Sequence, residues 1–360
     1  MITATCPTET ASDWRRQWRE AITDPHELLR MLHLEAFADH VIRPQDGEFP
    51  LRVPRNYVAR MRLGAINDPL LRQVLPVREE RLRAPGFALD AVGDLASRVD
   101  TGVLHKCPGR ALLIATGSCA VHCRYCFRRH FPYQQETAAR DHWQAAIATV
   151  RADASIEELL LSGGDPLALA TDKLRELTSG LANIRHLRRL RIHTRLPVVL
   201  PARVDDALCA WLQQLPWPLA IVLHINHAQE IHQELRTAVA RLRDSGAVVF
   251  NQSVLLSGVN DSVDTLADLS AALFAAGIVP YYVHLLDRVQ GSAHFEVAEA
   301  TAMAIEQALR ARLPGYLLPR FVREQAGQSH KTPLHLLAPG QASAARAGTV
   351  PATFSAMALK

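Results

Sequence analysis

Three cysteines lie within eight residues in the segment GSCAVHCRYC, which spans residues 117–126. Cys119, Cys123 and Cys126 follow a C-x₃-C-x₂-C spacing, and a compact loop with this spacing can present three thiolates to one inorganic centre. Three protein ligands leave one iron of a cubane [4Fe–4S] cluster without a fourth protein ligand. A cluster that binds a substrate directly needs such an open iron, so the segment predicts a cluster of this kind.

The cysteines also allow two other interpretations. A zinc site could be completed by His122 or His130, or the thiols could simply be buried. Zinc sites usually contain paired C-x₂-C halves, and the sequence has no second pair. The spacing therefore favours the cluster.

The cysteine segment directly follows a predicted strand and opens a series of strand–helix units. The predicted strands span residues 111–116, 158–162, 190–194, 220–225, 248–254 and 281–285. Helical patterns follow them at residues 140–151, 172–182, 205–215, 230–245, 265–276 and 298–313. Six such units in succession predict an α/β fold with a parallel sheet, either a barrel or an open doubly wound sheet, and place the chemistry in the loops after the strands.

The chain divides into three predicted parts. Residues 1–110 form a mainly helical and irregular extension, in which Asp24-Pro25 interrupts a helical pattern over residues 13–34. Residues 111–313 form the α/β core. Residues 314–360 form a partly extended C-terminal segment, and its small-residue-rich end, residues 342–360, is predicted to be loosely held.

The composition of the 360 residues is typical of a soluble globular protein, with 48% hydrophobic and 21% charged residues. The 18 Gly, 21 Pro and 6 Cys exclude collagen-like, disordered and disulfide-scaffold classes. The beginning of the chain does not resemble a signal peptide, and its apolar runs are too short to cross a bilayer. We therefore expect a cytoplasmic protein with reduced thiols and without a membrane or nucleic-acid partner.

Lysine is rare, because only four of the 40 basic residues are lysines. Lys173 is predicted to lie on a solvated helix face, and Lys360 is the last residue. Lys331 follows Gly327 in a flexible loop, from which its amine could reach a cavity and become nucleophilic through desolvation. From this pattern alone, a surface lysine is the more common interpretation of Lys331.

The position and spacing of the cysteines resemble the radical S-adenosylmethionine superfamily, whose fold is a partial (β/α)₆ barrel. That superfamily has a glycine-rich turn after its second strand, which contacts the amino group of the methionine moiety. Here the turn would be formed by Ser162, Gly163, Gly164 and Asp165. Two glycines allow a ligand to approach the backbone closely, and Asp165 offers an acceptor for an ammonium group.

Several further motifs, in order, resemble the lysine 2,3-aminomutase family between residues 67 and 333. They read NDP (67–69), RQVLP (72–76), CFRR (126–129), SGGD (162–165), LPVVLP (196–201), HINH (224–227), NQSVLLSGVND (251–261) and KTP (331–333). The resemblance implies that Lys331 binds pyridoxal phosphate covalently. It also implies that the phosphate of this cofactor is bound by Lys106, Arg110 and Arg124. The substrate would be bound by Arg128, Asp287 and Glu324.

In this comparison, Arg128 would pair with the substrate carboxylate, and the two acids with its distal ammonium. His224 would lie beside pyridoxal phosphate. The family usually has arginine, tyrosine and aspartate where this chain has Lys106, Cys107 and Glu324. Without the resemblance, Arg128 would be taken for a surface ion pair, His224 for a packed histidine and each acid for a loop carboxylate.

The resemblance implies conversion of L-lysine to (R)-β-lysine. A reduced cluster would release a 5′-deoxyadenosyl radical from S-adenosylmethionine, and the amino group of lysine held on pyridoxal phosphate would move from Cα to Cβ. An electron donor such as flavodoxin or ferredoxin would be required. The absence of cysteine after Cys209 resembles the branch that supplies β-lysine for modification of translation elongation factor P by a lysylation enzyme.

Three alternatives have different requirements. A catabolic lysine, or other amino acid, 2,3-aminomutase would share the site. A radical S-adenosylmethionine enzyme that modifies RNA would use the cysteines but would not need Lys331, Asp287 and Glu324. A cluster-bearing electron-transfer protein would not cleave S-adenosylmethionine.

Overall fold

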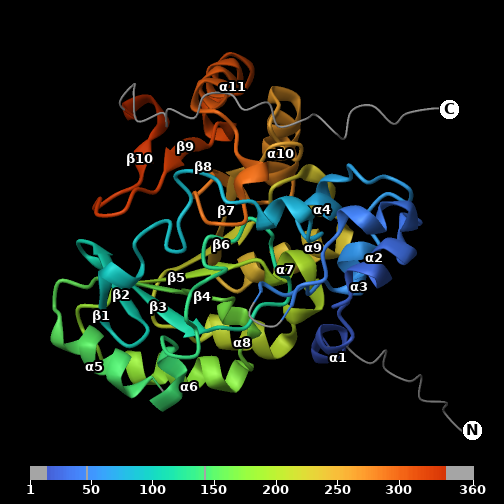
Figure 1. Cartoon of the computed structure of the whole chain (residues 1–360). Helices are drawn as coiled ribbons and strands as arrows, with labels where there is room; N and C mark the ends of the chain where they lie inside the picture. The colour runs from blue at the N-terminus through green and yellow to red at the C-terminus, as the bar shows by residue number, and fades with distance from the viewer. Residues whose placement is uncertain (1–13, 46–47, 142, 338–360) are drawn as a thin grey trace, which may run out of the picture.

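The fold is built on one sheet, in which the strands pair in the order of the sequence (Figure 1). The computed structural model describes residues 14–45, 48–141 and 143–337. Within these residues the strands are β1 (Arg98–Asp100), β2 (Val103–Cys107), β3 (Arg110–Thr116), β4 (Glu158–Gly163), β5 (Arg189–Thr194), β6 (Leu219–His224), β7 (Ala247–Leu255), β8 (Val279–Leu285), β9 (Arg320–Arg323) and β10 (Thr332–Pro333). Strands β3 to β9 pair in parallel, and antiparallel pairs extend the sheet at both edges.

Helices follow the central strands and cover their outer face. In the described part of the chain they are α1 (Trp14–Arg19), α2 (Pro25–Met31), α3 (Arg55–Val58), α4 (Pro69–Arg72), α5 (Gln144–Ala152), α6 (Thr171–Leu181), α7 (Leu196–Val199), α8 (Asp206–Gln213), α9 (Gln233–Asp244), α10 (Val263–Ala275) and α11 (Glu299–Arg312). Short 3₁₀ helices lie between them. In Figure 1, α5, α6 and α8 line one side of the strands, and the N-terminal helices α2 to α4 lie beside α7 and α9.

The alternation of side chains along the strands separates the core from the interior of the sheet. Leu113, Leu161, Ile192 and Ile221 are register partners across β3 to β6, and all are buried in the main hydrophobic cluster. The residues one position earlier, such as Leu160 and Arg191, point to the opposite face, where they line a cavity.

The sheet forms a partial barrel around this cavity. Side chains from every strand between β2 and β8 border the same cavity, which requires the sheet to curl around it. The six predicted strands correspond to β3 to β8, with bounds that differ by at most two residues. The partial (β/α)₆ barrel is therefore confirmed.

Both ends of the sheet extend beyond the predicted core. Strands β1 and β2 lie inside the segment predicted to be helical and irregular. They form strands there because β2 pairs antiparallel with β3. Strands β9 and β10 add the C-terminal segment to β8 and enclose the loop that carries Lys331. The prediction for residues 342–360 falls outside the described residues.

The predicted helix break at Asp24-Pro25 lies between α1 and α2. Asp24 caps α2 by accepting a hydrogen bond from His26 N, and Pro25 begins that helix. Asp68 caps α4 in the same way by accepting from Leu70 N and Leu71 N.

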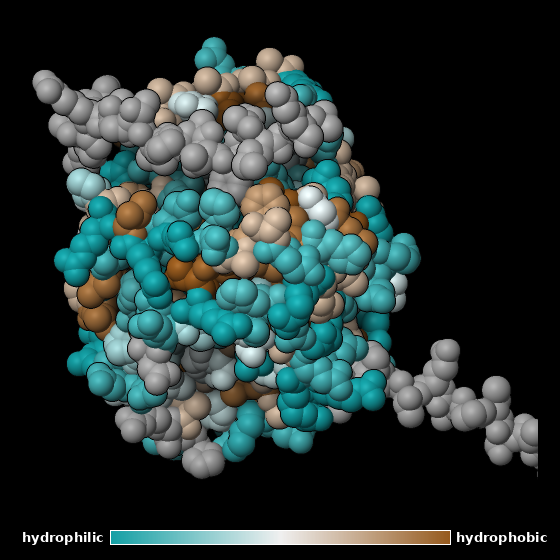
Figure 2. All heavy atoms as spheres, turned by 45° about the vertical axis from the view of Figure 1, so that its right-hand side comes forward, coloured by the Kyte–Doolittle hydropathy of each residue, from teal (hydrophilic) through white to brown (hydrophobic). Residues whose placement is uncertain are grey.

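No helix in the described residues is long and apolar enough to span a membrane. On the face shown in Figure 2, hydrophilic residues surround small, separate groups of hydrophobic residues. The exposed large hydrophobic residues come from distant parts of the chain, such as Leu63, Leu82 and Phe274.

Candidate functional site

A cavity of about 590 Å³ occupies the interior of the partial barrel. Its lining includes the cysteine loop after β3 and the glycine-rich turn after β4. It also includes Arg110 at the beginning of β3 and Lys331 in the loop between β9 and β10. One cavity therefore joins the predicted cluster site with the predicted cofactor lysine.

The three cysteines of the motif all border this cavity. Among the described residues, no three His, Cys, Asp or Glu side chains are arranged to share a single metal ion. In a cubane cluster the three thiolates bind three different irons, so this result leaves the cluster interpretation intact. The two histidines considered for zinc bind backbone carbonyls instead, because His122 Nδ1 lies 3.1 Å from Pro50 O and His130 Nε2 lies 3.0 Å from Gln290 O.

The glycine-rich turn packs directly against the cysteine loop. Gly164 N donates to Thr116 O over 2.7 Å, and Asp165 N donates to Ser118 O over 2.8 Å. A Cβ atom on Gly164 would lie 2.5 Å from Ser118 O, and one on Gly163, where φ is +112°, would lie 2.6 Å from Thr116 O. Only glycine permits this contact between the two loops.

We expect Gly164→Ala to lower the free energy of unfolding by roughly 1–3 kcal/mol, because the methyl group forces the two loops apart. The same displacement should weaken the binding of S-adenosylmethionine. Urea denaturation and a titration with S-adenosylmethionine measure the two effects. Gly315→Ala is the control, because a Cβ atom there meets open space; equal behaviour of the two variants would contradict the prediction.

The carboxylate of Asp165 is not free to accept an ammonium group, which corrects the prediction for this residue. It is buried and accepts four hydrogen bonds from the protein. The donors are Leu167 N (3.1 Å), Thr194 Oγ1 (2.7 Å), Arg195 N (2.7 Å) and Leu196 N (2.9 Å). Asp165 therefore fixes the loop after β5 against the glycine turn. If this turn contacts S-adenosylmethionine, its backbone atoms would make the contact.

Two lysines that border the cavity share one carboxylate. Lys331 Nζ lies 2.6 Å from Glu324 Oε2, and Lys106 Nζ lies 3.1 Å from Glu324 Oε1. Burial alone would raise the pKa of Glu324, but the two ammonium groups hold it well below its ordinary value. Glu324 is thus an ionised acid that can bind a cation of the substrate when Lys331 is engaged elsewhere.

Several buried polar atoms of the cavity have no hydrogen-bond partner among the described residues. They include Arg110 Nε, His193 Nε2, His284 Nε2 and Asp287 Oδ1. Buried polar atoms are nearly always satisfied, so these atoms indicate a polar ligand. The free donor of Arg110 fits a phosphate, and Lys331 supplies the primary amine that pyridoxal phosphate requires. Lys106 borders the same cavity, where its Nζ contacts Val92 O (2.9 Å), Asp94 Oδ1 (2.6 Å) and Glu324 Oε1 (3.1 Å).

Arg128 and His224 both border the cavity that contains Lys331. Arg128 Nε donates to Asp94 Oδ2 over 2.6 Å, and its Nη1 donates to Ser162 Oγ over 3.1 Å. His224 Nε2 lies 3.1 Å from Gln252 Nε2, and burial lowers the pKa of His224 to about 3, so its ring is neutral.

Arg124 does not border the cavity, and its predicted contact with the phosphate is not supported. Its guanidinium is buried and donates to both carboxylate oxygens of Glu80, over 2.8 and 2.6 Å. It also donates to the carbonyls of Phe49 and Pro50. Arg124 therefore fixes the loop between the cysteines to the N-terminal segment.

Two of the charged residues that border the cavity and were not predicted are Asp94 and Arg195. Asp94 forms ion pairs of 2.6 Å with both Lys106 and Arg128, and thus joins the predicted phosphate and carboxylate sites. Arg195 lies 2.7 Å from the sulfur of Cys123. Only Arg195 had a signal in the sequence, since a charged residue directly after a predicted strand is placed where ligands bind.

Comparisons with known proteins agree with this geometry. The family model described as a 4Fe-4S single cluster domain matches residues 106–188. The chain is 46% identical to the L-lysine 2,3-aminomutase of Escherichia coli (strain K12), over 92% of this chain and 97% of that protein. It is 42% identical to the L-lysine 2,3-aminomutase of Haemophilus influenzae, over 89% and 95% of the two chains. It is 32% identical to that of Acetoanaerobium sticklandii, over 91% and 79%.

Proposed function

Since this chain belongs to the L-lysine 2,3-aminomutase family, we propose that it converts L-lysine to (R)-β-lysine for the modification of elongation factor P. It is a radical S-adenosylmethionine isomerase, and its cofactors are a [4Fe–4S] cluster, S-adenosylmethionine and pyridoxal 5′-phosphate. The observation that carries the proposal is the single cavity that contains both the cysteine loop and Lys331. An enzyme that modifies RNA would not need the lysine, Asp287 and Glu324.

Cys119, Cys123 and Cys126 would hold the cluster, and the backbone of Ser162, Gly163 and Gly164 would contact S-adenosylmethionine. Lys331 would bind pyridoxal phosphate, with Lys106 and Arg110 at its phosphate and His224 beside it. When bound, these cofactors supply the one-electron and carbonyl chemistry that reaches an unactivated C–H bond and moves an amino group, which protein side chains cannot do.

The side chains orient the substrate by its charged ends. Arg128 would bind the α-carboxylate of lysine, and Asp287 and Glu324 would bind its distal ammonium. Glu324 also pairs with Lys106, but Asp287 Oδ1 is buried and has no partner among the described residues. A substrate without that ammonium would leave the Asp287 carboxylate without a counter-ion, at a cost of roughly 3–5 kcal/mol. The enclosing strands keep water away from the reacting atoms.

We expect the use of lysine to depend on pH through Asp287. Burial and the neighbouring Glu324 raise the pKa of Asp287 to about 7. Below that pH the carboxyl group of the free enzyme is neutral and cannot pair with an ammonium. The kcat/KM for lysine should therefore fall as the pH decreases through 7, approaching about tenfold per pH unit. Asp287→Asn should have a lower kcat/KM and lack this inflection; two profiles of the same shape would contradict the prediction.

An anaerobic assay with reconstituted cluster, reductant, S-adenosylmethionine and L-lysine tests the function. We expect β-lysine together with 5′-deoxyadenosine. Conversion of arginine or glutamate in place of lysine would overturn the substrate assignment. Formation of (S)-β-lysine, or failure of the elongation factor P lysylation enzyme to use the product, would overturn the proposed role. The proposal includes a cytoplasmic location and a one-electron donor such as flavodoxin or ferredoxin.

A further inference from the structure

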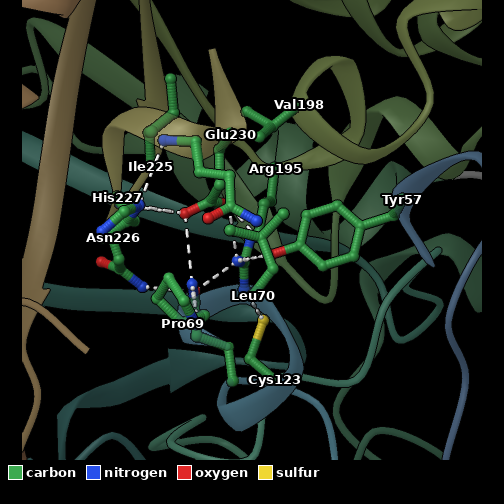
Figure 3. Close-up of polar contacts among 12 residues, drawn as sticks. Tyr57, Pro69, Leu70, Cys123, Arg195, Val198, Ile225, Asn226, His227 and Glu230 are labelled. Atoms are coloured by element: carbon green, nitrogen blue, oxygen red, sulfur yellow. Dashed lines mark hydrogen bonds and ion pairs between the residues drawn. The ribbon is translucent and has the colours of Figure 1, made fainter. Parts of the chain in front are cut away.

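Arg195 is a buried cation that lies between a cysteine of the motif and a buried acid. It follows β5 directly, and 5% of its surface is exposed. Figure 3 shows its guanidinium between the sulfur of Cys123 and the carboxylate of Glu230. Its partners are Cys123 Sγ (2.7 Å), Tyr125 Oη (2.7 Å), Gln73 Oε1 (2.6 Å), Glu230 Oε2 (2.9 Å) and Tyr57 Oη (3.2 Å).

The orientation of this guanidinium is fixed by the carboxylate of Glu230, which is fully buried. Glu230 Oε1 accepts hydrogen bonds from Asn226 N (2.9 Å) and His227 N (3.1 Å). Tyr57 Oη donates to Glu230 Oε2 over 3.3 Å. Arg195 and Glu230 therefore form a dipole with a fixed direction, and its positive end faces Cys123.

The N-terminal segment supplies part of this arrangement. Tyr57 comes from α3 and Gln73 follows α4, so both belong to the segment that precedes the sheet. Gln73 is fully buried and contacts both members of the pair, because its Oε1 accepts from Arg195 and its Nε2 donates to Glu230 Oε1. The segment thus holds the cation in place beside the cysteine loop.

We propose that Arg195 is a positioning residue that raises the reduction potential of the cluster through Cys123. Reduction adds one electron to the cluster, from a one-electron donor, without making or breaking a bond to the protein. The added negative charge is stabilised by a nearby cation and by hydrogen bonds to the cysteine sulfur. The inference rests on the proposed function, because it takes Cys123 as a cluster ligand.

A redox titration of the reconstituted cluster, followed by electron paramagnetic resonance, tests this role without relying on turnover. We expect Arg195→Met to reduce the ratio of reduced to oxidised cluster at a fixed potential about tenfold, which corresponds to a shift of about 59 mV to lower potential. Arg195→Lys keeps the charge and should lie closer to the wild type. Glu230→Gln removes the negative end of the dipole and should shift the potential in the opposite direction.

Arg203→Met is the matched control, because Arg203 is equally buried but binds Asp205 and the carbonyls of Leu167 and Leu169. Its potential should equal that of the wild type. The inference is overturned if Arg195→Met and Glu230→Gln both keep the wild-type potential. If Arg195→Met takes up no iron, an unchanged potential in Glu230→Gln still overturns it. If the wild-type protein assembles no cluster, the proposed function fails instead.

Discussion

Replacing Lys331 by alanine should abolish both the absorbance of bound pyridoxal phosphate and the conversion of lysine. The Lys331 amine lies in the cavity, 2.6 Å from Glu324, and 30% of its side chain is exposed. Without this amine the cofactor has no covalent attachment, and we expect kcat to fall by on the order of a thousandfold or more. Absorbance spectra and β-lysine formation measure the two effects.

Lys173→Ala is the control for this experiment. Lys173 lies on α6, where its ammonium pairs with Glu176 Oε2 over 2.7 Å and about half of its side chain is exposed. This placement confirms the predicted solvated face. The control should keep both the absorbance and the activity. A Lys331→Ala protein that still showed the cofactor absorbance of the wild type would place the covalent linkage elsewhere.

The Lys331→Ala variant also separates the cleavage of S-adenosylmethionine from the conversion of lysine. Lys331→Ala should leave the cysteine loop intact, because that loop is held by Thr116 and by residues of the N-terminal segment. Reductive cleavage of S-adenosylmethionine without lysine turnover is therefore the expected behaviour.

The central strands could be predicted from the sequence because each is a short apolar run followed by a helical pattern. The residues of β6, LAIVLH, illustrate this, since Ile221 and Leu223 are buried against helices. Strand β2, with the residues VLHKC, lacks such a run, and its place depends on antiparallel pairing with β3. Pairing between strands is a tertiary effect that local patterns do not contain.

For the site residues too, the sequence predicts some features, whereas others depend on tertiary contacts. Asp287 is far in the sequence from Glu324 and Lys331, and the fold brings all three to one cavity, as the family resemblance implied. The motifs do not, however, specify the direction of a side chain. Arg124 lies between two cysteines of the motif, yet it is bound by Glu80, which lies 44 positions earlier.

Asp165 failed as a predicted ammonium acceptor for a related reason. A buried carboxylate is satisfied by whichever donors the fold brings near it, and here these are the hydroxyl of Thr194 and three backbone N–H groups. The donors from the loop after β5 are about thirty positions away in the sequence, so the motif alone could not show that the carboxylate is already occupied.

Replacing Cys126 by alanine should remove the cluster while leaving the pyridoxal phosphate site intact. Two thiols remain in this variant, and a cubane with two protein ligands is not held firmly, so we expect iron content and 5′-deoxyadenosine formation to be lost. Cys107→Ala is the control, because Cys107 borders the same cavity but lies outside the motif. That variant should keep its iron. Iron retained at the wild-type level in Cys126→Ala would contradict the cluster assignment. The opposite losses in Cys126→Ala and Lys331→Ala would assign the two chemistries to two different sets of residues around one cavity.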